Sequence, residues 1–219
     1  MPQRRVPLVV DEVYHVFSRS IAKYTIFSRK ENYLRFKQIL EYYKVARKVS
    51  FSHYLRKEKS NKHNQPMSET DGQKLVDLLG YCIMPTHIHL ILMQYGEQGI
   101  SIFMKNVLNS YTHYFNNITQ RMGPLWESRF KYVRVKKDEQ LLHLTRYIHL
   151  NPVTAYLVEK PELWEFSSYN EYCGRIPVSD RICKWDEIVE IKEDSYKDFV
   201  ENDIDFQREL ARIKNLLIE

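Results

Sequence analysis

The sequence is poor in cysteine, and the positions of its cysteines exclude two kinds of site. Cys82, Cys173 and Cys183 are odd in number and form no CxxC pair. A disulfide framework or a four-cysteine zinc centre needs paired cysteines at short, regular spacings. We therefore interpret the three as reduced thiols with a structural role.

Long apolar runs are also missing. No stretch approaches the roughly 18 apolar residues that span a bilayer, so we expect no membrane partner. The first residues, MPQRRVPLVVDEVYHVF, lack an extended apolar stretch followed by a small-residue cleavage site. Such a start is not typical of a signal peptide, and we expect a cytoplasmic protein. The 43% of hydrophobic residues indicates a globular fold.

Positive charge is concentrated toward the N-terminus. Residues 1–63 hold 15 Lys and Arg against 5 Asp and Glu, whereas residues 185–219 hold 5 against 11. This asymmetry favours a main domain that binds a polyanion and a separate acidic C-terminal element. An ordinary solubility charge is the alternative, and charge alone does not decide between them.

Hydrophobic periodicity predicts alternating α and β elements. It indicates strands at 13–19, 74–84, 88–95 and 130–136, with a turn at Pro85-Thr86, and helices at 30–47, 100–117 and 138–150. Ser28 is expected to cap the first helix, with Glu31 in a capping box. The polar segment 57–72 is predicted to be a loop or insertion. The order predicts an α+β fold, an antiparallel sheet with helices on one face.

Two histidines flank Ile88 in the segment THIHL. Residues two apart on a strand point to the same face, so His87 and His89 would project side by side. Two adjacent imidazoles can serve as ligands to one divalent ion. His-x-His also occurs by chance, and the alternative is a pair of exposed or core histidines.

A second candidate group lies in RYIHLNPV at 146–153. Tyr147 and Asn151 are four residues apart, so they share one face of a helix. A tyrosine hydroxyl becomes a useful nucleophile beside a metal-polarised phosphate, and an amide oxygen is a suitable ligand for Mg²⁺ or Mn²⁺. In a chain with 16 tyrosines, a packing role for Tyr147 is the alternative.

The third segment is GPLWESRFKYVRVKK at 123–137. It interleaves aromatic and basic residues, as proteins do that hold single strands by base stacking and cations. The alternative is a solvated strand face with core aromatics. The predicted DNA-binding set is Arg129, Lys131, Arg134, Lys136 and Trp126, together with Arg19 from the first strand.

Taken together and in this order, YCIMPTHIHLILM, GPLWESRF and RYIHLNPVTAYLV resemble the insertion-sequence-200-like single-tyrosine transposases. These belong to the superfamily named for its His-hydrophobic-His motif, and the resemblance is to the branch of REP-associated tyrosine transposases. The segments YHVFSRSIAKYTIF and WEFSSYNEYCG fit as well. The likeness covers about residues 10–175.

The resemblance implies a ferredoxin-like sheet and a metal, Mg²⁺ or Mn²⁺, bound by His87, His89 and Asn151. It implies that Tyr147 attacks single-stranded DNA near a hairpin, leaving a 5′-phosphotyrosine and a free 3′-hydroxyl. Relatives work as monomers or as homodimers, so either state is open. Thr86 departs from the Asn that often precedes the first histidine, and we expect little effect on metal binding.

The resemblance also divides the chain. Residues 1–175 are expected to form the catalytic domain, with a polar insertion at about 57–72, and residues 176–219 an acidic helical extension. We expect this extension to dock on the basic face. Two rival functions are a domesticated, non-catalytic hairpin-binding protein and a zinc hydrolase. The complete set of His87, His89, Tyr147 and Asn151 argues against the first, and the absence of an HExxH motif argues against the second.

Overall fold

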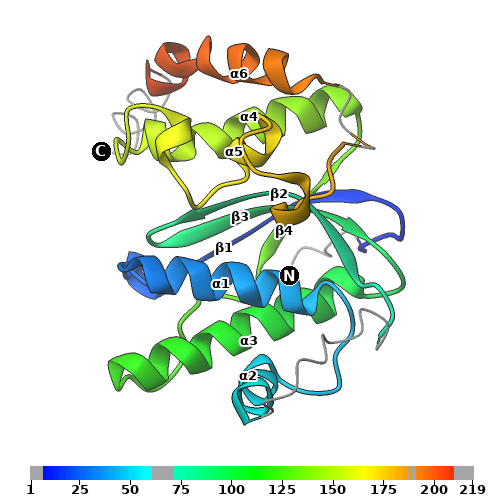
Figure 1. Ribbon diagram of the computed structural model, residues 1–219, viewed down its shortest axis with the longest axis vertical. Coiled ribbons are helices and arrows are strands. Elements are labelled where there is room, and N and C mark those ends of the chain that lie inside the picture. The colour runs from blue at the N-terminus through cyan, green and yellow to red at the C-terminus, as the bar shows by residue number, and fades with distance from the viewer. Residues whose placement is uncertain (1–6, 61–71, 187, 189–190, 210–219) are drawn as a thin grey trace, which may run out of the picture.

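Four antiparallel strands form the centre of the protein in a computed structural model that describes residues 7–60, 72–186, 188 and 191–209. The strands are β1 (Val13–Arg19), β2 (Val76–Met84), β3 (His87–Gln94) and β4 (Lys131–Val135). Their order across the sheet is β2-β3-β1-β4 (Figure 1). All four predicted strands are confirmed, and β2 and β3 turn at Pro85-Thr86 as expected.

Two long helices cover one face of this sheet. They are α1 (Lys30–Tyr43) and α3 (Gly99–Thr119), and both bury a stripe of apolar residues. The inward side chains of α3 follow helical spacing, among them Phe103, Val107 and Tyr111. The element order and strand order are those of a ferredoxin-like fold, so the α+β prediction is confirmed.

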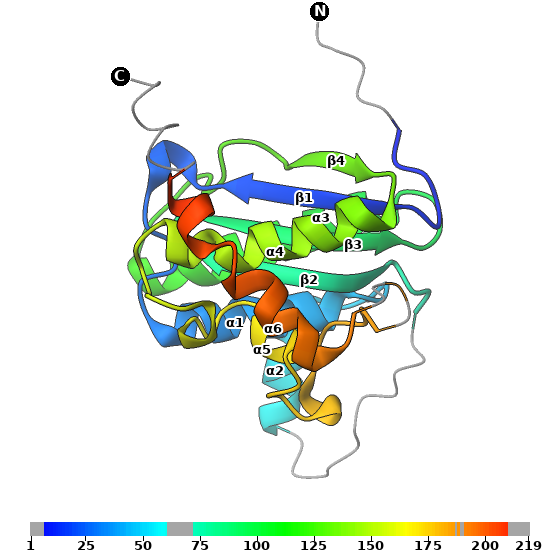
Figure 2. The same ribbon diagram turned by 90° about the horizontal axis from the view of Figure 1, so that it is seen from above.

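Helices also cover the other face of the sheet, whereas the sequence predicted helices on one face only. Helix α4 (Asp138–Thr154) lies across the sheet there, with α5 (Tyr169–Tyr172) and α6 (Glu193–Glu201) beside it (Figure 2). The short 3₁₀ helices are η1 (Ile21–Lys23), η2 (Pro161–Leu163) and η3 (Val178–Asp180). This second layer brings the face with the two histidines under α4.

Two local predictions were wrong. Helix α1 is capped by Arg29 and not by Ser28, because the Arg29 backbone N–H donates to the Asn32 side chain at 3.1 Å. The segment 57–72 is not all loop, since α2 (Phe51–Ser60) includes its first residues. Residues 61–71 lie outside the described residues.

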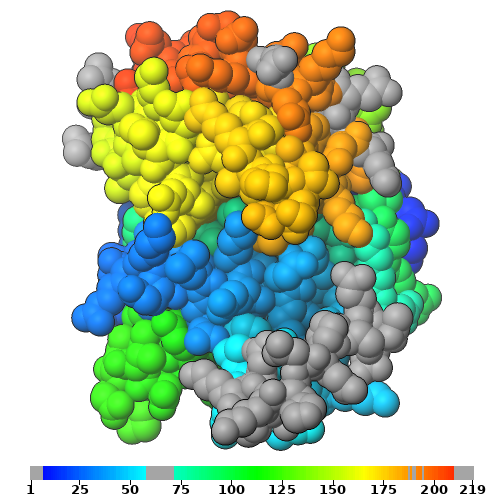
Figure 3. Space-filling model, in the orientation of Figure 1, coloured from blue at the N-terminus to red at the C-terminus, as the bar shows by residue number. Residues whose placement is uncertain are grey.

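The C-terminal extension packs on α4. Tyr196 and Val200 of α6 are fully buried, and Asp203 pairs with Arg146 of α4 at 3.3 Å. In the space-filling view the extension and the segment that follows α4 form one continuous surface (Figure 3). The described part of the extension therefore docks on α4 and not on the basic face at 129–137, since buried Tyr196 and partly buried Phe199 of α6 pack against His149 and Arg146. No described helix is long and apolar enough to cross a membrane.

Candidate active site

The alternation of β3 places its two histidines on the α4 side of the sheet. Ile88 between them is fully buried in the core, so His87 and His89 share the opposite face. Their ring centroids are 5.1 Å apart, with an angle of 84° between the rings. The structure thus brings the two predicted ligands side by side.

A third histidine, which the sequence analysis did not single out, joins them from β1. His15 lies 3.0 Å from His89, Nε2 to Nδ1, and the two rings stack at 5.2 Å. The only signal for it was its position in the VYHVFSR strand, two residues before Phe17 and four before Arg19 on the same face. His15 is therefore placed to orient His89.

Each of the two candidate histidine ligands, His87 and His89, keeps one ring nitrogen free. The Nδ1 atom of His89 is engaged by His15, and Nδ1 of His87 lies 3.0 Å from the Thr86 hydroxyl. The remaining Nε2 atoms are available to a cation, and such outer partners fix the orientation of ligating imidazoles. Thr86 thus supports His87, a role that the sequence analysis missed.

Burial keeps these imidazoles neutral. It lowers the pKa of His15 to about 4, and burial together with the nearby Arg19 charge lowers the pKa of His87 to about 4. The pKa of His89 lies well below its usual range, because the ring is buried and faces His87 and His15. A neutral imidazole is the form that binds a metal ion.

Helix α4 brings Tyr147 over these rings. The Tyr147 ring stands edge-on to His89 at 5.9 Å and to His15 at 6.3 Å, yet 41% of the residue is exposed. Burial, with a smaller contribution from Cys82, raises the pKa of its hydroxyl above the usual 10. The Tyr147 side chain is thus partly open to solvent, and its hydroxyl is protonated at neutral pH.

Asn151 lies one helical turn beyond Tyr147. Its Nδ2 atom is buried and has no hydrogen-bond partner among the described residues. The two amide atoms are exchanged by a flip of the side chain, so this group can present its oxygen. Two neutral imidazoles and an amide oxygen fit a divalent cation, whereas the described residues contain no group of three His, Cys, Asp or Glu side chains that could hold one.

The predicted DNA-binding residues do not lie together on one surface. Arg19, Arg129, Lys131 and Lys136 are exposed. Lys131 pairs with Phe17 in the sheet and so lies on the histidine face, whereas Arg134 lies on the other face, where it is ion-paired with Glu12. The edge strand β4 is exposed along most of its length.

Trp126 does not reach the surface. It is only 8% exposed, its Nε1 donates to the Leu108 carbonyl at 3.3 Å, and its ring neighbours are Phe36 and Tyr111. The prediction that it stacks on a DNA base was therefore wrong, and the alternative of a core aromatic holds.

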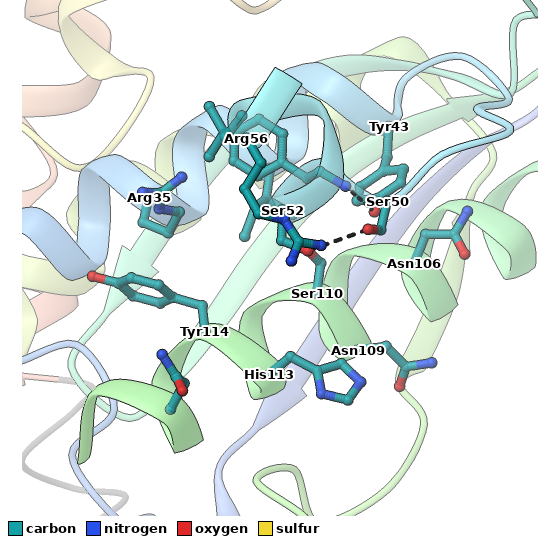
Figure 4. Close-up of a pocket in the computed structure, with 14 residues that line it drawn as sticks. Arg35, Tyr43, Ser50, Ser52, Arg56, Asn106, Asn109, Ser110, His113 and Tyr114 are labelled. Carbon is teal, nitrogen blue, oxygen red and sulfur yellow. Dashed lines mark hydrogen bonds between the residues drawn. The ribbon is translucent and has the colours of Figure 1, made fainter. Parts of the chain in front are cut away.

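Hollows open on both sides of the sheet, and two of them differ in size and lining. The larger, about 810 Å³, lies between α1, α2 and α3 (Figure 4), on the side of the sheet opposite the histidines. Arg35, Arg56 and His113 line it, and none of its described lining residues is Asp or Glu. The smaller, about 450 Å³, adjoins the histidine face and includes His15.

Comparisons with known proteins agree with this arrangement. Residues 51–151 match the family described as transposase, IS200-like. A Haemophilus influenzae protein assigned as a REP-associated tyrosine transposase is 27% identical in an alignment of 104 residues, which covers 43% of this chain and 59% of that protein. The chain thus spans less than two thirds of this relative's length.

One solved structure has the same fold, and a second is less similar. A REP-associated tyrosine transposase bound to a REP hairpin superposes with a TM-score of 0.56 at 14% identity, over 88% of this chain and 99% of the other. A Deinococcus radiodurans R1 structure described as a transposase gives a TM-score of 0.36 at 16% identity, over 68% and 95%. The family match, the relative and the shared fold agree with the resemblance found in the sequence: residues 51–151 match the IS200-like transposase family, and the chain is similar to a REP-associated tyrosine transposase.

Proposed function

We propose that this protein cleaves and rejoins single-stranded DNA beside hairpins, with Tyr147 as the nucleophile. One observation carries the proposal: an exposed tyrosine on α4 stands edge-on to His89, within the cluster of neutral histidines on the sheet. The H. influenzae relative bears the name of a REP-associated tyrosine transposase, and the solved relative is bound to a REP hairpin. The first name supports a transposase activity, and the second supports a hairpin-containing DNA substrate.

His87, His89 and Asn151 would hold a divalent cation, Mg²⁺ or Mn²⁺. When bound there, the cation would neutralise charge on the phosphate and make it easier to attack. The Tyr147 oxygen forms a bond to phosphorus, and the bond from phosphorus to the 3′ oxygen breaks. The proton of the Tyr147 hydroxyl leaves to solvent, which reaches this exposed side chain, and the departing 3′ oxygen gains a proton.

The products are a 5′-phosphotyrosine and a free 3′-hydroxyl. Because the new ester replaces the old one, the 3′-hydroxyl can attack the phosphotyrosine, release Tyr147 and restore the strand without ATP. Arg19, Arg129, Lys131 and Lys136 would hold the phosphates on either side, since they are exposed cations. A non-catalytic protein that binds hairpins is the alternative.

Covalent trapping tests the proposal. The protein is incubated with labelled hairpin DNA from beside its own gene, with Mn²⁺ or Mg²⁺, and is run on a denaturing gel. We expect a labelled adduct that is absent without metal and absent in Tyr147→Phe. The matched control is Tyr24→Phe, because Tyr24 is also exposed (53%). Tight hairpin binding without any adduct would favour the non-catalytic alternative.

A further inference from the structure

The smaller hollow shares His15 with the surroundings of the candidate nucleophile, Tyr147. It opens between the edge strand β4 and the first turns of α4 and has a volume of about 450 Å³. His143 on its rim is four residues before Tyr147, one helical turn of about 5.4 Å along α4. His15 in its wall is edge-on to Tyr147 at 6.3 Å. A group bound in the hollow would thus contact His15 and His143, the first a ring neighbour of Tyr147 and the second one helical turn before it.

The wall of the hollow is apolar and partly aromatic. Val133, Val135 and Leu144 line it together with the His15 ring. Val133 is 58% exposed, although a β-branched side chain on a sheet face normally packs against a covering layer. A flat apolar ring set against such a wall would bury this surface, and bases stack on side-chain rings in this way.

The rim of the hollow supplies groups whose character as hydrogen-bond donor or acceptor is fixed by their neighbours or by their chemistry. The Gln140 side-chain oxygen accepts from the Lys136 backbone N–H at 3.0 Å, which leaves its amide N–H groups as donors. Arg146 lies 2.9 Å from His143 Nδ1 and can only donate, so Nδ1 accepts and Nε2 carries the hydrogen. The Glu139 carboxylate, 81% exposed, accepts only.

This carboxylate distinguishes the hollow from the larger one, whose described lining residues include no Asp or Glu (Figure 4). A carboxylate repels a phosphate but accepts a hydrogen bond from the exocyclic amine of a base, as acidic side chains do with cytosine. Cytosine, adenine and guanine carry such an amine, whereas thymine has none.

We infer that this hollow binds a nucleobase with an exocyclic amine, on the nucleotide next to the cleaved phosphate. The inference rests on the proposed function, because it assumes that DNA lies over Tyr147. Glu139 would accept from the amine, Gln140 would donate to a ring nitrogen or carbonyl, and the face of the base would lie on Val133. The protein would then select its cleavage site in part by this base.

Binding measurements test the inference without any cleavage. Tyr147→Phe is titrated with fluorescent hairpins whose single-stranded flank carries, at each position in turn, cytosine, adenine, guanine, thymine or an abasic site. At one flank position we expect thymine and the abasic site to bind about tenfold more weakly than the preferred base, which is the discrimination that one good base contact provides.

Two added substitutions locate this discrimination. Glu139→Gln should reduce the preference for the amine-bearing base over thymine, and Val133→Trp, which fills the hollow, should remove the difference between base and abasic site. Glu159→Gln and Val178→Trp, at exposed positions outside the hollow, should keep both. Glu139 and Val133 are exposed, so both variants are expected to fold. If Val133→Trp nevertheless misfolds, Glu139→Gln alone tests the inference.

Equal binding of all four bases and the abasic site at every position would overturn the inference, and so would a preference that Glu139→Gln leaves unchanged. These outcomes are separate from the trapping result. An adduct without base preference retains the proposed function and overturns the hollow's role. A base preference that Glu139→Gln removes, without any adduct, overturns the proposed cleavage and leaves the hollow as a base-binding site of a non-catalytic protein.

Discussion

His15 on β1 and His89 on β3 share a hydrogen bond of 3.0 Å, and their rings stack at 5.2 Å. The two residues are 74 positions apart in the chain. This contact leaves only Nε2 of His89 free for a cation and fixes the direction in which it points. His15 is therefore a positioning residue for the proposed metal site.

Replacing His15 should weaken metal binding without abolishing it. His15→Phe removes the partner of His89 Nδ1 while it keeps a ring in the same place. Loss of such an outer partner typically costs 10- to 100-fold in metal affinity, so adduct formation should need about that much more Mn²⁺. The readout is the Mn²⁺ concentration at half-maximal adduct. His113→Phe, on the far side of the sheet, is the control, and an unchanged Mn²⁺ requirement in His15→Phe would exclude the positioning role.

Asn151 should show a conflict between stability and function. Its Nδ2 is buried without a partner, and an unsatisfied buried polar group costs about 1–3 kcal/mol. Asn151→Leu, of similar size, should leave the free energy of unfolding in metal-free buffer unchanged or raise it, and should lower Mn²⁺ affinity. Urea unfolding and calorimetric Mn²⁺ titration measure the two effects. A large loss of stability with unchanged Mn²⁺ affinity would make Asn151 a structural residue, and Asn109→Leu is the exposed control.

The basic residues should differ in their dependence on salt. Each phosphate contact on a single strand contributes a slope of about −0.7 in log affinity against log salt. Lys131→Ala, on the histidine face, should make the slope shallower by about 0.7. Arg134→Ala should change it less, because Arg134 is ion-paired with Glu12 on the other face. Equal changes for both variants would contradict this assignment of faces.

Acid should destabilise the protein through its buried histidines. His149 is fully buried between Tyr196 and Ser168, each at 2.7 Å, and burial lowers its pKa to about 3. Between that value and the ordinary 6.5, the unfolded chain binds a proton that the folded protein does not. Stability is therefore complete above about pH 6.5 and falls as the pH drops toward 3.

For His149 alone the loss between pH 6.5 and 5 is about 2 kcal/mol, at about 1.4 kcal/mol for each pH unit. Urea unfolding at pH 7.5 and 5.0 measures it. His149→Gln should be less stable at pH 7.5, since one of the two hydrogen bonds is lost, but its decrease on acidification should be about 2 kcal/mol smaller. A decrease as large as in the unsubstituted protein would show that His149 is not the group that titrates.

The local pattern of the sequence determined much of this protein. Strand alternation was enough to put His87 and His89 on one face, and helical spacing was enough to align Tyr147 with Asn151. The strands and the three long helices follow from the same periodicities. These predictions succeed because backbone geometry sets the direction of neighbouring side chains whatever the rest of the chain does.

Only the tertiary structure decided which distant residues meet. The pairing of β1 with β3 brings His15 to His89, and the packing of α6 on α4 joins Tyr196 to His149. Trp126 lies in a segment of aromatic and basic residues that is typical of DNA stacking, yet the packing of α3 and α1 placed it in the core. Such contacts depend on strand order, register and the competition for buried space, none of which a local periodicity records.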